Sequence, residues 1–265
     1  MIQNESGAMP DMQNSRDERN IAIDRVGVRG VQYPIRVLDR QNEIQNSIGT
    51  FTLTVDLPKH FKGTHMSRFL EVLGEHAGMV SVQSIPVILA ELRERLESEQ
   101  SHLDVDFTYF ISKPAPVTRK PGLMGYECRF EAGGGLKNDL VVQVRIPVTT
   151  LCPCSKEISD YGAHNQRGYV TVRIRAKDHI WIEEIIEKIE ARASAPLYPL
   201  LKRPDEKFVT ELAYDNPRFV EDMVREVSLL FNDDERITWY SVEVENHESI
   251  HAHNAYASIE RTKSG

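Results

Sequence analysis

Two segments of alternating sequence decide the fold: LVVQVRIP at residues 140–147 and YVTVRIR at residues 169–175. In each, a branched apolar side chain stands at every second position, with mostly polar residues between. This period of two is typical of a β-strand that buries one face and leaves the other polar. Because the two strands follow one another along the chain with a short link, they are expected to pair in an antiparallel sheet.

The same order of elements is predicted on either side of the glycine run at residues 133–135. The predicted strands are residues 33–38, 47–57, 103–111, 122–130, 140–147, 169–175, 237–245 and 255–259, and the predicted helices are residues 66–76, 85–96, 180–189 and 217–231. The glycine run divides them into two units, residues 21–135 and 136–265, each with the order β-β-α-α-β-β. We therefore expect an α+β fold in which two antiparallel sheets can join and the helices cover one face.

Composition excludes several classes of protein. The 265 residues are 40% hydrophobic and 27% charged, as in a folded globular chain. A net charge of −8 makes nucleic acid a poor partner. No apolar run reaches membrane-spanning length, and the polar residues 1–20 lack the apolar core of a secretory signal. We expect residues 1–20 to be loosely attached, and the chain to work in the reducing cytoplasm with no membrane partner and no disulfide framework.

The link between the two opening segments carries CPCSK at residues 152–156 and GAHNQR at residues 162–167. Cysteine and histidine are common zinc ligands, and two of the three cysteines of the chain lie here. The spacing does not match a structural zinc site, which needs four closed protein ligands. Two interpretations remain open. The cysteines are small apolar side chains at a strand end, or Cys152 and His164 bind a metal that keeps one open, catalytic position.

A third ligand would be a carboxylate, which composition alone does not identify. Residues 202–207, KRPDEK, form a charge-rich stretch that is either a solvated loop or the source of a ligand, Asp205 or Glu206. Glu221 stands near the start of a predicted helix, where the helix dipole favours a carboxylate. As an acceptor-only group, it could instead take paired hydrogen bonds from a ring amidine or a guanine edge.

Two further polar segments could carry chemistry. NHESIHAH, residues 246–253, is either a surface turn or the place of general acid–base groups, since histidine titrates near neutrality. KGTHMSR, residues 62–68, is either an ordinary helix start capped by Thr64 or a phosphate site. The sequence contains neither a P-loop nor a dinucleotide-binding glycine fingerprint, so any nucleotide would be bound in another way.

In combination, residues 62–69, 147–156, 162–167 and 248–253 resemble the type IB family of GTP cyclohydrolase I, and the resemblance extends over most of residues 20–265. The family implies the tunnelling fold, in which tandem β-β-α-α-β-β units assemble into a barrel-like homo-oligomer, here expected to be a tetramer. It also implies conversion of GTP and water to 7,8-dihydroneopterin triphosphate and formate. That reaction is the first step of tetrahydrofolate synthesis, with queuosine synthesis as a second destination.

The resemblance also implies roles for individual residues. The implied metal ligands are Cys152, His164 and Glu206. The implied metal is zinc or manganese, with iron less favoured, because a Cys-His pair suits zinc and a carboxylate admits manganese. Catalytic roles fall to Cys152 and to the histidines expected to transfer protons, which are His251, His253 and His65. The implied substrate-binding residues are Glu221 for the guanine edge and Lys62, Arg68 and Arg167 for the triphosphate.

Three alternatives stay open at this point. A nitrile reductase of the same fold would use Cys152 as a metal-free covalent nucleophile with NADPH. A related cyclohydrolase would leave a cyclic phosphate and prefer iron. A non-catalytic module would bind a purine, a pterin or a metal and convert nothing.

Overall fold

The computed structural model describes residues 13, 15–76, 80–135 and 139–263. In this part of the chain, nine strands form one antiparallel sheet in the order β1-β2-β3-β4-β5-β6-β8-β9, and the short β7 pairs with β5. The strands are β1 (Ile23–Asp39), β2 (Glu43–Leu57), β3 (Ser101–Ser112), β4 (Leu123–Gly134), β5 (Asp139–Leu151), β6 (Asn165–Ala176), β7 (Ala195–Pro196), β8 (Ile237–His247) and β9 (Ala255–Thr262). The helices are α1 (Met66–Glu75), α2 (Ile85–Leu96), α3 (Pro153–Ile158), α4 (Ile182–Glu190), α5 (Arg203–Asp215) and α6 (Val220–Asp233).

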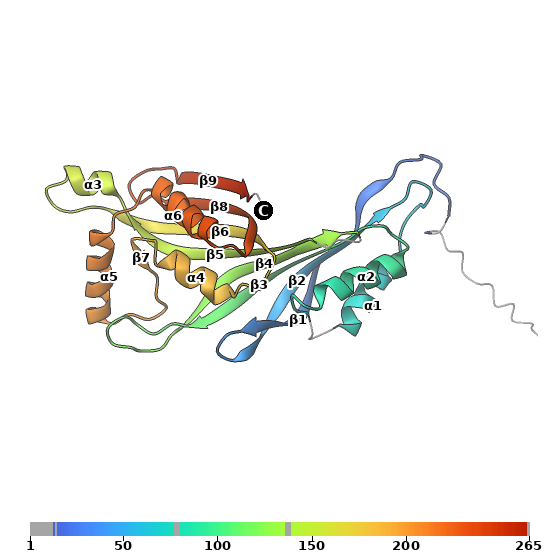
Figure 1. Ribbon diagram of the computed structural model, residues 1–265, viewed down its shortest axis with the longest axis horizontal. Helices are drawn as coiled ribbons and strands as arrows, with labels where there is room; N and C mark the ends of the chain where they lie inside the picture. Colours follow the sequence, from blue (N-terminus) through green and yellow to red (C-terminus); the bar gives the residue numbers. More distant parts are fainter. Residues whose placement is uncertain (1–12, 14, 77–79, 136–138, 264–265) are drawn as a thin grey trace, which may run out of the picture.

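The predicted double pattern is confirmed, and the two sheets are continuous. Strands β4 and β5 pair from Glu127 opposite Arg145 to Gly133 opposite Asp139, so the glycine run lies in a hairpin inside one sheet. In the first unit α1 and α2 return the chain to the sheet, so that β2 pairs with β3; in the second unit α4, β7, α5 and α6 lie between β6 and β8, which also pair. Figure 1 shows an elongated molecule in which α1 and α2 lie towards one end, while α3 and α5 lie at the other.

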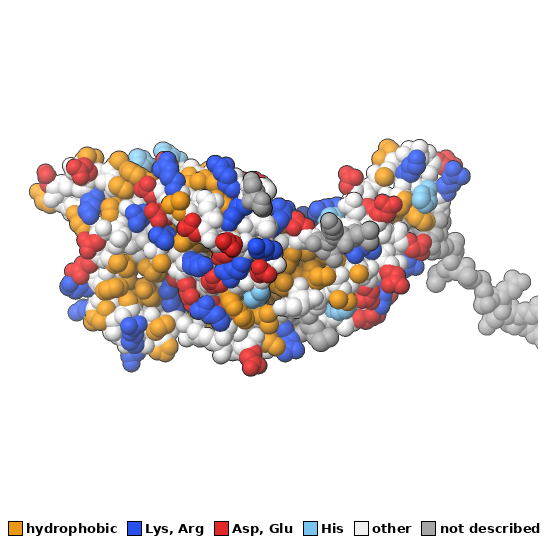
Figure 2. Space-filling model, in the orientation of Figure 1, with side chains coloured by type: hydrophobic (Ala, Val, Ile, Leu, Met, Phe, Trp, Pro, Cys, Tyr) orange, Lys and Arg blue, Asp and Glu red, His pale blue; other side chains and the backbone are white. Residues whose placement is uncertain are grey.

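The sheet has one apolar and one charged face. On the apolar face, side chains such as Val144, Ile146 and Val172 are completely or almost completely buried beneath the helices. The intervening positions of the same strands carry ion pairs, for example Arg145 with Glu127. Between the helices of the two units, apolar side chains reach the surface (Figure 2), and the groove there is lined by residues that include Val37, Phe130, Val142, Ile174 and Trp181.

Three elements differ from the sequence-based expectation. The KRPDEK stretch is not a loop: the helix α5 begins at Arg203, because the buried Asp205 accepts a hydrogen bond from the Lys202 amide (2.9 Å) and so caps the helix start. The short helix α3 occupies part of the link between β5 and β6. Helix α6 begins at Val220 and not at residue 217, because the Arg218 amide donates to the Leu151 carbonyl at the end of β5.

The N-terminal segment also differs from its expectation in part. Residues 1–12 and 14 lie outside the described residues. The Asp17 amide donates to the His60 carbonyl, and the amides of Lys62 and Gly63 donate to the carbonyls of Ser15 and Gln13. This stretch is therefore attached to the loop before α1. That helix begins at Met66, and its N-cap is His65, not Thr64.

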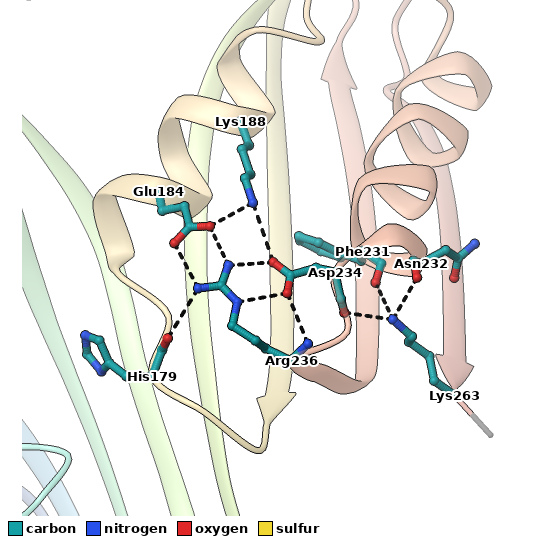
Figure 3. A network of polar contacts seen from close by, with 8 residues as sticks. All are labelled: His179, Glu184, Lys188, Phe231, Asn232, Asp234, Arg236 and Lys263. Carbon is teal, nitrogen blue, oxygen red and sulfur yellow. Dashed lines mark hydrogen bonds and ion pairs between the residues drawn. The ribbon is translucent and has the colours of Figure 1, made fainter. Parts of the chain in front are cut away.

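An ion-pair network holds α4, α6 and the two last strands together (Figure 3). Arg236, in the turn between α6 and β8, contacts Glu184 of α4 and Asp234 beside it. Lys263, just after β9, donates to the carbonyls of Phe231, Asn232 and Asp234 at the end of α6. The network holds the C-terminal end of α6, and the candidate site lies at the opposite end of that helix.

Candidate active site

A pocket of about 350 Å³ opens at one end of the sheet, where β5 and β8 end, β6 begins and α6 starts. Its lining comes from four separate parts of the second unit. The lining residues are Cys152, Cys154, His164, Gln166, Arg218, Phe219, Val220, Glu221, Asn246, Glu248, His251, His253 and Ala255. The pocket therefore unites the Cys-His motif, the carboxylate Glu221 and the two histidines that the sequence singled out separately.

Cys152 is placed by the end of a strand and the start of a helix. It follows β5 directly, and as the N-cap of α3 its sulfur accepts a hydrogen bond from the Ser155 amide (3.4 Å). Its own amide donates to the His164 carbonyl (3.1 Å), which brings the two ends of the link together. Cys152 is half-buried and Cys154 is exposed, and both are free thiols.

His164 is oriented by the loop between β8 and β9. Its Nδ1 lies 3.0 Å from the Ser249 hydroxyl, and its amide donates to the Ser155 hydroxyl (3.3 Å). In metal-binding histidines one ring nitrogen is commonly held by a hydrogen bond in this way, which leaves the other nitrogen as the ligand atom. The Cys152 sulfur and the His164 imidazole thus provide two donors suited to zinc.

The predicted third ligand, Glu206, lies elsewhere in this chain. It is exposed on the first turn of α5 and does not line the pocket. Only the other end of α5 approaches the site, where Lys156 Nζ donates to the Tyr214 carbonyl (2.6 Å). Glu206 precedes Tyr214 by roughly 12 Å along the helix axis, at a rise of about 1.5 Å per residue. Within the described residues, no three His, Cys, Asp or Glu side chains are grouped closely enough to hold a metal ion.

Asp205, the other candidate ligand of that stretch, is fully buried and has a structural role. One carboxylate oxygen accepts hydrogen bonds from the amides of Val117 and Thr118 (2.8 Å each), and the other accepts from the Thr118 hydroxyl (2.6 Å). These bonds fasten the loop that follows β3 in the first unit to α5 in the second. Both carboxylate oxygens of Asp205 are therefore used in hydrogen bonds within the protein and are not free to bind a metal.

Glu248 is a pocket carboxylate that sequence reasoning did not select. It is half-buried in the loop after β8, and its Oε1 accepts a hydrogen bond from Gln166 Nε2 on β6 (3.2 Å). The sequence did contain a signal for this residue, because Glu248 lies inside the histidine-rich stretch, residues 246–253. Its position beside Cys152 and His164 depends on the pairing of β6 with β8, which the sequence does not specify.

Glu221 and the two histidines face the same space. Glu221 is exposed in the first turn of α6, where the helix dipole favours a negative charge. The rings of His251 and His253 are stacked, with centroids 5.2 Å apart and planes 21° apart. The pocket therefore combines an acceptor-only carboxylate with two imidazoles, which are side chains that can donate or accept a proton.

The remaining predicted residues do not line this pocket. Lys62 lies in the loop before α1, and His65 and Arg68 lie at the start of α1, in the other half of the elongated chain (Figure 1). Arg68 Nη1 donates to the Arg95 carbonyl near the end of α2 (2.7 Å). Arg167 is exposed on β6 and alternates with the buried Gln166 and Gly168, so it points to the face opposite the helices.

The continuous antiparallel sheet with paired helices on one face makes this chain a tunnelling-fold protein. Among solved structures, urate oxidase from Bacillus sp. TB-90 matches with a TM-score of 0.51 and 7% sequence identity, over 91% of this chain and 100% of that chain. Uricase from Arthrobacter globiformis matches with a TM-score of 0.50 and 8% identity, over 91% and 95%. At such low identity, the likeness shows the fold alone.

Sequence comparison identifies the family. The family model described as Type I GTP cyclohydrolase folE2 matches residues 9–257. GTP cyclohydrolase FolE2 of Kosmotoga olearia is 54% identical over 256 residues, covering 97% of this chain and 100% of the relative. GTP cyclohydrolase FolE2 of Citrifermentans bemidjiense is 52% identical over 256 residues, covering 97% and 96%. The chain belongs to the type I GTP cyclohydrolase FolE2 family.

Proposed function

We propose that this protein converts GTP and water to 7,8-dihydroneopterin triphosphate and formate, the first step of tetrahydrofolate synthesis. Full-length identity above one half to relatives named GTP cyclohydrolase FolE2 supports the reaction. The observation that carries the proposal is the single pocket in which Cys152, His164, Glu221, His251 and His253 meet.

The pocket has donors that suit a divalent metal. Cys152 offers a thiolate, and His164 offers a ring nitrogen whose partner nitrogen is already hydrogen-bonded to Ser249. We propose zinc or manganese, with iron less favoured, since sulfur and imidazole suit zinc and an added carboxylate admits manganese. When bound, such an ion would supply Lewis acidity and an activated water.

The protein's own groups would bind the base and move protons. The Glu221 carboxylate can accept both the N1–H and the 2-amino N–H of guanine, which is a pairing that adenine does not offer. His251 or His253 can give a proton to the imidazole-ring nitrogen of the purine as its C–N bond breaks. Two waters supply the two oxygens of formate, one by opening the imidazole ring and one by releasing the formyl carbon, and one water is returned when the ring recloses as the pterin with two ribose carbons.

The triphosphate residues Lys62 and Arg68, and the proton-transfer candidate His65, are proposed to act across a subunit boundary. Lys62, His65 and Arg68 lie far from the pocket in one chain, so a second copy would have to bring them to it. The edge strands β1 and β9 each pair with one neighbour only within the described residues, which leaves backbone groups open for pairing with another copy. We propose a homotetramer on this basis, with Arg167 on the open sheet face near such a junction.

The reaction is tested by anaerobic incubation of metal-reconstituted protein with GTP. We expect stoichiometric formate and a triphosphorylated pterin that fluoresces after oxidation, together with bound metal. Bound metal without formate would favour a non-catalytic binding module. Reactivity of Cys152 in a protein that binds no metal would favour the covalent nucleophile of a nitrile reductase.

Single substitutions test the individual roles. Cys152→Ala should lose bound metal and activity together, and full activity would exclude Cys152 as a ligand. Glu221→Gln should weaken GTP binding and leave the metal content unchanged. Glu206→Gln and Glu248→Gln decide the third ligand: if a neighbouring copy supplies Glu206, metal is lost in the first variant, whereas loss only in the second assigns Glu248.

The free cysteines support a proposal about the compartment. None of the described helices has the length and apolar character needed to cross a membrane. All three cysteines are free. We propose the cytoplasm as the site of action, where thiols such as Cys152 stay reduced.

A further inference from the structure

The link between β5 and β6 carries both predicted metal ligands but is largely exposed. The pairing of the two strands ends with Leu151 opposite Asn165, and residues 152–164 lie beyond it, with α3 at one end of the molecule (Figure 1). Even the apolar side chains of Ile158 and Tyr161 are exposed there. A segment with so little buried apolar surface is not held in place by packing. The relative position of Cys152 and His164 therefore depends on hydrogen bonds.

Ser155, in the first turn of α3, is hydrogen-bonded to both predicted ligands. Its amide donates to the Cys152 sulfur (3.4 Å), and its hydroxyl donates to the Cys152 carbonyl (3.1 Å). The same hydroxyl accepts a hydrogen bond from the His164 amide (3.3 Å). A serine hydroxyl has one donor hydrogen and two acceptor lone pairs, so it can make both of its bonds at once. Ser155 thus joins Cys152 to His164.

The other contacts of the two ligands do not replace those of Ser155. The Cys152 amide donates to the His164 carbonyl (3.1 Å), which connects the two main chains, and Ser249 contacts the His164 ring. Neither of these contacts involves the Cys152 sulfur. Ser155 itself is not among the residues that line the pocket. Any effect of Ser155 on the site must therefore act through Cys152 and His164.

We infer that Ser155 is a positioning residue, which holds Cys152 and His164 in one arrangement and so raises the affinity of the site for a divalent metal. This inference rests on the metal site of the proposed function. Ligands that are already fixed lose less conformational freedom when the metal binds. Residues that orient metal ligands typically contribute about 10- to 100-fold to metal affinity. We expect about 10-fold for the Ser155 hydroxyl, because its bonds go to main-chain groups of the ligands.

The test measures zinc affinity of the full-length protein by competition with a chromophoric chelator at fixed pH. Ser155→Ala should weaken zinc binding about 10-fold. Ser155→Thr should restore the affinity, because a threonine hydroxyl in a helix can make the same bond to the carbonyl three residues earlier. Ser159→Ala is the matched control: it removes a hydroxyl at the other end of α3 that accepts from the Tyr161 amide (3.3 Å), and it should leave the affinity unchanged.

A cobalt spectrum separates positioning from a merely structural role. With Co²⁺ in place of zinc, the thiolate-to-metal absorption reports on Cys152, and the ligand-field bands report on the geometry around the ion. At saturating cobalt, Ser155→Ala should shift or weaken these bands relative to wild type and Ser159→Ala. The Tm of the metal-free protein should be nearly the same in all of them. A structural role would instead lower that Tm and leave the spectrum of the saturated site unchanged.

The outcomes distinguish this inference from the proposed function. A wild-type protein that binds no zinc would overturn the proposed metal site and this inference with it. Zinc affinity that falls in Ser155→Ala and recovers in Ser155→Thr, in a protein that releases no formate from GTP, would support this inference and overturn the proposed reaction alone. Unchanged affinity and cobalt spectrum in Ser155→Ala would overturn the inference alone. Equal losses in Ser155→Ala and Ser155→Thr, or in Ser159→Ala, would also contradict it, because the Ser155 hydroxyl would then not be the cause.

Discussion

Replacing Arg236 by methionine should destabilise the second unit without touching the candidate site. Arg236 Nε and Nη2 donate to Asp234 Oδ1 and Oδ2 at 2.9 and 2.6 Å. Its Nη1 donates to Glu184 Oε2 (3.3 Å), so the guanidinium joins α4 to the turn before β8 (Figure 3). Methionine keeps much of the side-chain length and removes every donor.

The magnitude follows from burial and from the number of charged hydrogen bonds. The Asp234 side chain is 12% exposed and that of Glu184 is 20% exposed, so both carboxylates lose a partner in a largely desolvated place. Charged hydrogen bonds contribute about 1.5–3 kcal/mol each, and partial solvent access to Arg236 lowers the sum. We expect about 2–3 kcal/mol of lost unfolding free energy, or about 4–5 °C in Tm for a chain of this length.

The pH dependence gives this prediction a second readout. Hydrogen bonding to Arg236 is the main cause that holds the pKa of both Asp234 and Glu184 below the ordinary value. A carboxylate with a lowered folded pKa stabilises the protein above its unfolded pKa, and this contribution is lost as pH falls through the folded pKa. The difference in stability between wild type and Arg236→Met should therefore be full at neutral pH and decrease below about pH 4.

Thermal unfolding followed by circular dichroism, at one fixed protein concentration, measures both effects. Arg225→Met is the matched control, since Arg225 lies 3.9 Å from Asp222 and its side chain is 69% exposed. Exposed pairs of this kind contribute within about 1 kcal/mol. A Tm for Arg236→Met equal to that of the control at neutral pH, or a difference between wild type and Arg236→Met that grows as the pH falls, would refute the reasoning.

Three further substitutions test other contacts. Lys263→Met removes the donor from three carbonyls at the end of α6 and should cost about 1–2 kcal/mol in urea unfolding; an unchanged midpoint would contradict the capping role. Tyr109→Phe removes the hydroxyl that donates to the buried Glu183 carboxylate (2.7 Å) and should cost a similar amount, about 1–2 kcal/mol; a neutral effect would mean that water replaces the donor. Asp205→Ala should release the loop after β3, so that trypsin cuts after the exposed Arg119; equal cleavage rates in wild type and variant would show that Asp205 does not hold the loop.

Local patterns in the sequence predicted most of the elements. Alternation at residues 140–147 and 169–175 identified two adjacent strands, and helical spacing at residues 85–96 matched α2 to the residue. The stretch KRPDEK was ambiguous, because its charges suit both a solvated loop and the first turn of a helix. What settled it was Asp205, whose partners Val117 and Thr118 belong to the first unit and are distant in sequence.

The residues of the candidate site also fall into two groups: those that the sequence predicted and those that only the tertiary structure placed. Cys152 and His164 were predictable because their link is short and its two ends must meet where two paired strands begin and end. By itself, the sequence determined most of the elements along each unit, the apolar face of the strands and this pair of donors, because each depends on residues close together in the chain. Only the tertiary structure decided that Glu221, Glu248 and Asn246 share one pocket with them and that Glu206 does not, because those positions depend on the register of β6 with β8 and on the packing of α5 and α6 against the sheet.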